Sequence, residues 1–469
     1  MTKKYLDRHP MIARIVNWLK RVKSLDESEL AAIIRRDELK SLSDEEAVRL
    51  LHKQFGDIFE RLKNVPVNIE QGDGEPPKGN LDGKDFTPSC FLFDEDYAEI
   101  NRTVINFLAL KWLLEGRHEA FTAYQPKAVK LSQETFNRFR QLAQEILEQP
   151  DDILALVVSL VLGDVGKDPD LVKEIDKIDG KKTNHDEVLA RAIELDYFRK
   201  ALGLLPLRRQ RDVVRGVKVG AKLNIPQLVQ GENVPGSLRS IHKLRGHRQA
   251  FNLKYLEIML DVSGAGAHLD ARGAIRMIEP VCQSFLLAFP VLTDVITEKL
   301  SVRDAYNKVL QYRGELLAND GFPPLSTDNP SDRAFLRLCA MGRVAHRHLA
   351  ELFDHAFRSL PAPTKQELIH GLNVDGCDGE DAVILYYMPA IFAEGLRVTR
   401  GASDEKQIEV LQSLMSFMAR TYKDTKPITG HPSNIIERDV SAAKDFIQRE
   451  DFITNPTILN ECILPVATC

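Results

Sequence analysis

The chain has 469 residues, of which 43% are hydrophobic and 28% are charged, and its formal net charge is −5. This composition excludes an intrinsically disordered chain, and the negative charge argues against a protein that coats nucleic acid with its whole surface. The six cysteines are scattered and form no Cys-x-x-Cys pair. That pattern is typical of reduced thiols in a cytoplasm rather than of a disulfide framework or a zinc ribbon.

No segment predicts a membrane or secretory role. Polar and charged residues interrupt the apolar residues of 1–22, so no secretory signal is expected there. The longest apolar run, 153–162, is about half of what a bilayer span needs. We therefore expect a cytoplasmic protein without membrane contact, and nucleic acid is not favoured as a partner.

Helical periodicity dominates the chain. Residues 100–116, 134–149 and 408–422 carry apolar side chains at three- and four-residue spacings. Only the apolar stretch 382–392 is ambiguous between helix and strand. The sequence predicts an all-α, multi-helix globular protein.

Two segments rich in Gly, Pro and polar residues divide this helical chain. Residues 66–90 predict a linker or long surface loop, and 319–332 predict a second break. We therefore expect an N-terminal helical segment (1–65), a helical core (91–320) and a C-terminal helical portion (321–469). The last portion is a candidate homodimer interface.

The stretch LVLGDVGKDPDL (160–171) ends a nearly all-apolar segment, which predicts a buried helix. Asp164 then lies at the C-terminal end of that helix, where the helix dipole disfavours a carboxylate. A bound cation would remove the conflict. The alternative is an ordinary helix stop, with Gly163 as the C-cap glycine.

A second stretch, TNHDEVLARAI (183–193), brings His185 close behind in the sequence. Its alternative is an ordinary helix start, in which Thr183 or Asn184 caps the helix and Glu187 completes the cap.

Together the two stretches resemble the HD-domain superfamily of metal-dependent phosphohydrolases, whose buried helix ends in a pattern like L-H-D-x-G-K. Gly163 stands here in place of the His. The resemblance implies metal ligands at His118, Asp164, His185 and Asp261, and a divalent metal (Mn, Mg, Fe or Zn). It covers about residues 100–270.

The stretch YLEIMLDVSGAGAHLD (255–270) places Glu257, Asp261, Gly264 and His268 on one face, if it is one helix. Two acids and an imidazole are costly to bury unless they are paired or bound to metal. Glycines at 264 and 266 would let another backbone or a ligand approach closely. The alternative is that these glycines end the helix.

A basic segment between Arg199 and Arg248 has twelve Lys and Arg against two acids. Such a segment attracts anions, although it is equally expected of a solvated surface. Arg209 and Arg215 are candidate phosphate-binding residues. In the polar loop 222–238, Glu232 is a candidate for substrate binding or, like His268, for replacing the lost His.

These observations favour a metal-dependent enzyme that hydrolyses an anionic, phosphorylated small molecule or nucleotide. Hydroxide from water on the metal that Asp164 helps to bind would attack phosphorus, with Lys167 neutralising the phosphate. One alternative is a non-catalytic HD-like scaffold that binds a nucleotide or a protein. The other is a di-iron oxygenase, for which the pairs Glu115/His118 and Glu367/His370 have the Glu-x-x-His spacing.

Overall fold

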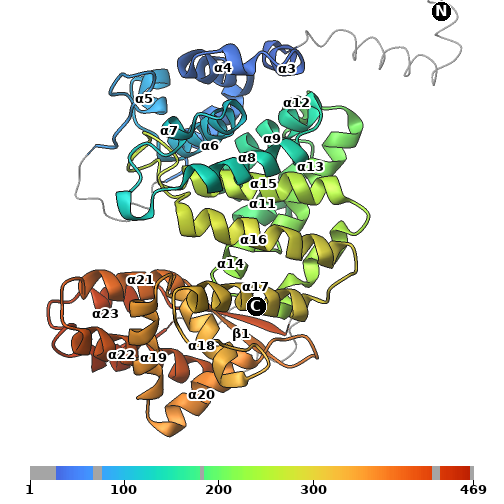
Figure 1. Cartoon of the computed structure of the whole chain (residues 1–469). Helices are drawn as coiled ribbons and strands as arrows, with labels where there is room; N and C mark the ends of the chain where they lie inside the picture. The colour runs from blue at the N-terminus through green and yellow to red at the C-terminus, as the bar shows by residue number, and fades with distance from the viewer. Residues whose placement is uncertain (1–27, 67–75, 180–183, 425–433, 465–469) are drawn as a thin grey trace, which may run out of the picture. The chain divides into compact units, whose positions relative to one another are not determined.

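The structure is a computed structural model that describes residues 28–66, 76–179, 184–424 and 434–464. Helices dominate these residues (Figure 1). The only named strands among them are β1 (Ala382–Tyr386) and β2 (Ile435–Asp439), which pair in parallel with Ala382 opposite Ile435. The predicted all-α class is confirmed.

The ambiguous apolar stretch 382–392 is divided between the two types of structure. Its β-branched and aromatic first half forms β1, and helix α21 (Met388–Val398) follows after a single residue. That residue, Tyr387, has a φ of 75°, which is uncommon for a bulky side chain. A proline at the second position of α21 suits the first turn of a helix.

Two compact units divide the chain, and each combines segments that are distant in sequence. The first contains Met1–Pro126, Arg140–Val214 and Leu260–Arg276, and the second contains Lys127–Phe139, Arg215–Met259 and Met277–Cys469. The sequence analysis expected contiguous segments instead. Three helices have residues in both units: α8 (Gln133–Ile146), α13 (Leu207–Gly220) and α15 (Arg248–Gly264).

Two helices of the first unit, α6 (Ala98–Glu115) and α9 (Pro150–Leu162), are almost entirely buried. Helix α9 begins with a proline and a capping box between Gln149 and Asp152, and its residues Leu154–Leu162 are all buried. The others are α3 (Glu29–Arg35), η1 (Leu39–Ser41), α4 (Asp44–Lys63), α5 (Pro88–Phe93), α7 (His118–Phe121), η3 (Val165–Lys167), α10 (Pro169–Asp179), α11 (His185–Glu194) and α12 (Arg199–Leu202).

The described part of the predicted linker or long surface loop is residues 76–90, of which 76–87 form a packed loop and 88–90 begin α5. The Lys78 amide donates to the Leu269 carbonyl, and the Ala271 amide donates to the Lys78 carbonyl. A Cβ at Gly79 would lie 2.0 Å from the Phe86 carbonyl, so the loop folds closely onto itself. Residues 76–90 therefore belong to the first unit, together with the helices on either side of them.

The second unit has one large hydrophobic core between Leu317 and Cys462, in which α22 packs against α19, α20 and α21 (Figure 1). Its further elements are η2 (Lys127–Val129), α14 (Ile225–Val229), η4 (Pro235–Leu244), α16 (Glu279–Ile296), α17 (Val302–Asn319), α18 (Pro330–Met341), α19 (Arg347–Arg358), α20 (Ala362–Asn373), α22 (Asp404–Asp424), α23 (Ala443–Ile447) and η5 (Pro456–Glu461).

Among the described residues, α16 is the one helix long and apolar enough to cross a membrane. Its buried residues Cys282, Phe285, Ala288 and Val291 recur every three or four positions. This spacing is typical of a helix with one face in a protein core. The expectation of a cytoplasmic protein without membrane contact stays a prediction.

Candidate functional site

The turn after α9 places Asp164 in the interior of the first unit. Gly163 has helical backbone angles, with a φ of −49° and a ψ of −45°, and η3 continues the turn. Gly163 is thus the C-cap of α9, as the helix-stop alternative expects, although its backbone is helical rather than left-handed. Asp164 is only 9% exposed, so its negative charge needs a partner.

Four charged side chains surround Asp164, and together these five residues form what we call the charged cluster. Lys167 Nζ lies 2.6 Å from Asp164 Oδ1 and 3.2 Å from Glu99 Oε2. Arg102 Nη1 lies 2.9 Å from Glu99 Oε1, and Arg102 Nη2 lies 3.8 Å from Asp261 Oδ1. Three carboxylates and two cations thus meet at the end of α9.

Close packing between α6 and the end of α15 brings Asp261 to the charged cluster. Asn106 Nδ2 donates to Asp261 Oδ1 at 3.2 Å. A Cβ at Gly264 would lie 2.0 Å from Asn106 Oδ1 and 2.6 Å from the Arg102 carbonyl. The close backbone approach predicted at Gly264 is confirmed, and its partner is α6.

Burial and mutual charge shift the pKa values within the charged cluster. Desolvation and the charge of Asp164 raise the pKa of Glu99 to about 7, against the pull of Arg102. Desolvation would also raise the pKa of Asp164, but Lys167 and Arg102 hold it well below its usual value. Below pH 7, therefore, the proton of this hydrogen-bonded pair resides on Glu99.

The charge of Arg102 is held by the same neighbours. Desolvation alone would lower the pKa of its guanidinium, but Asp164, Asp261 and Glu99 raise it. The pKa of Asp261 is raised, first by desolvation and then by the charge of Asp164. The charged cluster is thus one coupled set of ionisable groups rather than a series of separate pairs.

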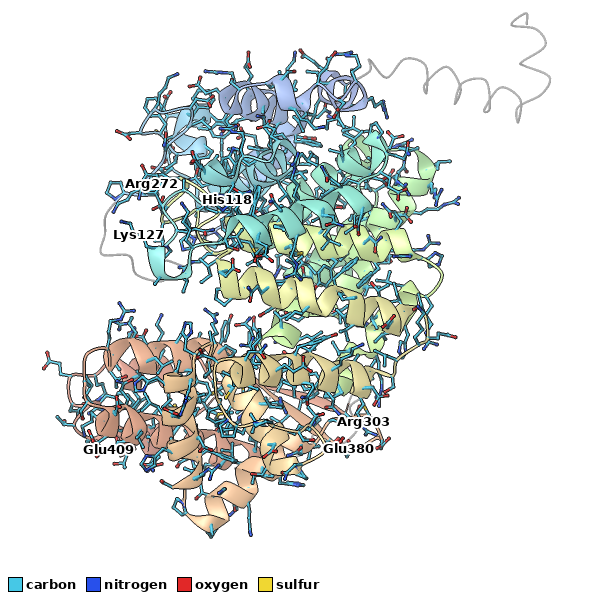
Figure 2. The ribbon with its side chains drawn as sticks, viewed as in Figure 1. His118, Lys127, Arg272, Arg303, Glu380 and Glu409 are labelled. Atoms are coloured by element: carbon cyan, nitrogen blue, oxygen red, sulfur yellow. The ribbon has the colours of Figure 1, made fainter. Side chains whose placement is uncertain are left out.

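The predicted metal ligands meet only in part. Asp164 and Asp261 lie in the charged cluster, whereas the His185 side chain is 49% exposed and faces Asp186, with Nε2 3.6 Å from Oδ2. Half-buried His118 begins the short helix α7 (Figure 2). Helix α15 ends at Gly264, so half-buried His268 does not continue its face. The alternative, in which the glycines of 255–270 end the helix, is therefore confirmed.

The turn after α9 and the start of α11 do touch, but through the backbone. A Cβ at Gly166 would lie 2.0 Å from the His185 carbonyl oxygen and 3.2 Å from Leu189 Cβ. The Asn184 side chain caps α11 by accepting from the Glu187 amide at 2.9 Å. The ordinary helix start proposed for His185 is thus confirmed with Asn184 as the cap, and Thr183 lies outside the described residues.

The candidate ligands do not suit a divalent cation as they stand. Among the described residues, no three His, Cys, Asp or Glu side chains gather in a metal-binding arrangement. Asp164 already bonds Lys167 and Glu99, and Asp261 accepts from Asn106. Lys167 would compete with a metal for Asp164, whereas a carboxylate that accepts one hydrogen bond, such as Asp261, keeps further lone pairs. Metal binding stays a prediction.

The predicted substrate-binding residues lie outside the charged cluster. Arg209 is held by two carboxylates, with Nε 2.6 Å from Asp152 Oδ1 and Nη1 3.0 Å from Asp212 Oδ2. Glu257 is buried and its Oε1 lies 2.8 Å from Lys254 Nζ. Arg215 is half-buried on α13. Their roles in substrate binding stay predictions.

Glu232 is buried in the second unit. It contacts Tyr387, the residue between β1 and α21. Its Oε1 accepts from the Tyr387 amide at 2.6 Å, so it holds the residue with the positive φ. Desolvation raises the pKa of Glu232 to about 7, although the Tyr387 amide opposes the shift. In the adjacent Asn233, both polar atoms of the side-chain amide, Oδ1 and Nδ2, are buried without a partner.

Glu99 and Arg102, which were not predicted from the sequence, take part in three of the four ion pairs given above for the charged cluster. Both lie on α6, where they are three residues apart in an otherwise largely apolar helix. Charged residues in such a helix were the available signal, since they are rarely buried unless they are paired.

The fold and the charged cluster define an all-α protein with a buried, ion-paired centre at the end of a core helix. Residues 48–459 match a family described as a family of unknown function, DUF6829, and the chain belongs to this family. No curated protein and no solved structure matches the chain. The resemblance to the HD-domain superfamily stays a prediction.

Proposed function

We propose that this protein is a non-catalytic, HD-like helical binding protein. In it, Arg102 and Lys167 would supply the positive charge that a metal supplies in HD phosphohydrolases. The observation that carries the proposal is the 2.6 Å contact between Lys167 Nζ and Asp164 Oδ1. Asp164 is the residue that corresponds to the aspartate of the HD-domain motif.

The charge balance of the cluster supports this proposal. When Glu99 carries its proton, Asp164 and Asp261 together balance the charges of Arg102 and Lys167. A divalent cation would add two charges to a set of groups that is already neutral and, apart from the half-exposed Asp261, mostly buried. Such uncompensated charge is costly away from water.

A second candidate is the metal-dependent phosphohydrolase. It is favoured by the meeting of Asp164 and Asp261, two ligands that the family resemblance implies, beside the same guanidinium. In this version Lys167 would leave Asp164 when metal binds. The two candidates therefore differ in whether Lys167 is a permanent partner of Asp164.

Metal analysis combined with Lys167→Met separates the candidates. For the binding protein we expect no stoichiometric metal after purification, and no rise in melting temperature with Mn²⁺, Fe²⁺, Zn²⁺ or Mg²⁺. Lys167→Met should lower the free energy of unfolding by about 2–4 kcal/mol, because it leaves a buried carboxylate short of a partner. The double variant with Asp164→Asn should recover part of that loss.

Lys173→Met is the matched control. Lys173 Nζ lies 3.1 Å from Asp170 Oδ1 with the same three-residue spacing, but both side chains are more than 60% exposed. An exposed pair contributes less than about 1 kcal/mol. Stoichiometric metal that Asp164→Asn removes, together with hydrolysis of phosphorylated small molecules, would overturn the proposal and establish the hydrolase.

A further inference from the structure

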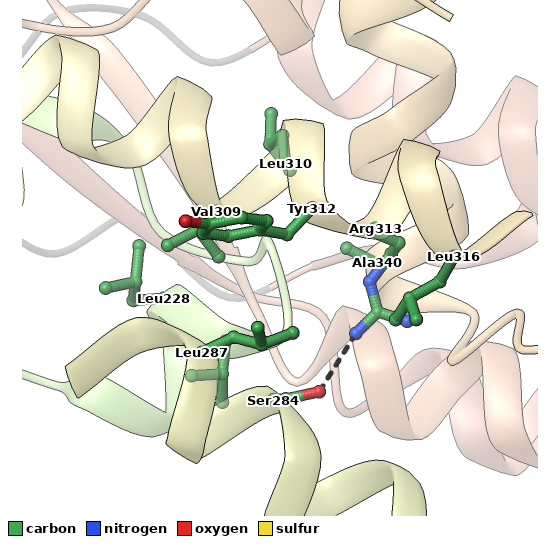
Figure 3. Close-up of a pocket in the computed structure, with 10 residues that line it drawn as sticks. Leu228, Ser284, Leu287, Val309, Leu310, Tyr312, Arg313, Leu316 and Ala340 are labelled. Carbon is green, nitrogen blue, oxygen red and sulfur yellow. Dashed lines mark hydrogen bonds between the residues drawn. The ribbon is translucent and has the colours of Figure 1, made fainter. Parts of the chain in front are cut away.

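A pocket lies within the second unit, between α14, α16, α17 and α18 (Figure 3). Its empty volume, including the open mouth, is about 350 Å³. That volume counts open solvent, so the pocket is open at its mouth rather than a closed cavity. Small-molecule sites combine apolar walls with a few polar groups. The walls here are mostly aliphatic and include Leu228, Val229, Leu287, Val309, Leu310 and Leu316.

The one cation that lines this pocket is Arg313, on α17. Its Nη2 donates to Ser284 Oγ at 3.3 Å (Figure 3). Its Nη1 donates to the Val344 carbonyl at 3.5 Å. Both bonds are long for a guanidinium. No carboxylate among the described residues lies within 4.0 Å of Arg313, because none of the ion pairs there includes it.

Several other guanidinium groups in the interior have closer partners than Arg313. Arg102 and Arg209 contact carboxylates, and Arg337 contacts four backbone carbonyls. Desolvation lowers the pKa of Arg313, and the nearby charge of Arg343 acts in the same direction. A positive charge against an apolar wall is costly unless an anion completes the site.

We propose that this pocket binds a small amphipathic carboxylate. Its carboxylate would contact Arg313 and Ser284, and its apolar tail would pack against the aliphatic wall. A planar guanidinium matches a carboxylate by two parallel hydrogen bonds. The site lies in the second unit, so this proposal goes beyond the proposed function, which concerns the charged cluster of the first unit, and stands whether or not that cluster binds metal.

Binding of octanoate to the purified full-length chain, measured by calorimetry, tests the proposal. Octanoate should bind, whereas 1-octanol and acetate should bind at least about tenfold more weakly, because each lacks one half of the recognised chemistry. Equal binding of octanoate and 1-octanol would overturn the proposal, and so would the absence of octanoate binding.

Arg313→Met should weaken octanoate binding at least about tenfold, which is what one charge-assisted hydrogen bond contributes. Without ligand, the same variant should melt at the same or a higher temperature, because it removes an uncompensated charge from an apolar wall. A lower melting temperature with octanoate binding unchanged would show that Arg313 is only structural.

Two further variants keep the test independent of Arg313. Leu287→Trp should fill the pocket and abolish octanoate binding, while Arg313 stays in place. Lys308→Met removes an exposed cation from the same helix, α17, and should leave binding unchanged. Equal losses in Lys308→Met and Arg313→Met would reduce the effect to general charge attraction and overturn the site.

Discussion

Two interior arginines, one in each unit, are neutralised in different ways. Arg102 in the first unit contacts carboxylates, chiefly Glu99 at 2.9 Å. Arg337 in the second unit is 0% exposed and donates only to backbone carbonyls, of which the nearest is that of Leu372, at 2.6 Å. The other three carbonyls belong to Gly231, Glu232 and Asn233.

The two arginine centres should therefore differ in how they respond to pH. Carboxylates gain and lose protons, whereas backbone carbonyls do not, so the environment of Arg102 varies with pH and that of Arg337 does not. A charge held by carbonyls ties loops together at any pH. We therefore expect the Arg337 centre to act in stability alone and the charged cluster to couple stability to protonation.

The largest expected effect comes from Arg337→Met. Four hydrogen bonds from a charged donor are lost, and the Glu232 carbonyl loses its guanidinium donor in the interior. Chemical denaturation should show a loss of at least about 3 kcal/mol in the free energy of unfolding. The loss should be the same at pH 5 and pH 8, and a pH-dependent loss would contradict the comparison.

Arg358→Met is the control for this variant. Arg358 is 72% exposed on α19 and bonds Asp354. Its removal should change the free energy of unfolding by less than about 1 kcal/mol.

A somewhat smaller effect is expected from Glu99→Gln, and it appears only in the pH dependence. The pKa of Glu99 is raised to about 7 in the folded chain, so the folded state binds more protons than the unfolded state between about pH 4.5 and 7. Stability from this group is thus present below that window and is lost as the pH rises through 7. Between pH 5 and pH 8 the wild type should lose about 2–3 kcal/mol through Glu99.

Glutamine cannot ionise but can still donate to Asp164, so Glu99→Gln should remove that part of the pH dependence. Denaturant unfolding at pH 5, 6, 7 and 8 measures it. Glu232→Gln provides the comparison in the second unit, because the pKa of Glu232 is also raised to about 7 and its amide analogue can still accept from Tyr387. Unchanged slopes in both variants would show that neither carboxyl is coupled to folding.

The smallest effect separates the two glycines of the motif that follows α9. Gly166→Ala would place a Cβ 2.0 Å from the His185 carbonyl oxygen, so backbone must move. We expect a loss of about 1–3 kcal/mol in thermal or denaturant unfolding. Gly163 has helical backbone angles, so Gly163→Ala should leave the free energy of unfolding unchanged or raise it by up to about 1 kcal/mol. The reverse order would mean that Gly163 is the structurally required glycine.

Much of the fold was readable from local patterns. The apolar run before Gly163 correctly indicated a buried helix, and α11 begins with the Asn184 cap that the sequence offered. The stretch 382–392 was ambiguous because short apolar runs suit strands and buried helices equally, and the structure contains both. The stretch 255–270 was open between one helix and a helix that ends at its glycines, and α15 ends at Gly264, where α6 approaches closely.

By itself, the sequence determined the all-α class, the buried helix before Gly163 and the need for positive charge near Asp164, because these follow from periodicity and from the cost of burying a charge. Only the tertiary structure decided what supplies that charge. Arg102 lies some sixty residues earlier in the chain and reaches Asp164 through the packing of α6. Such a meeting depends on how helices pack, which local spacing does not encode.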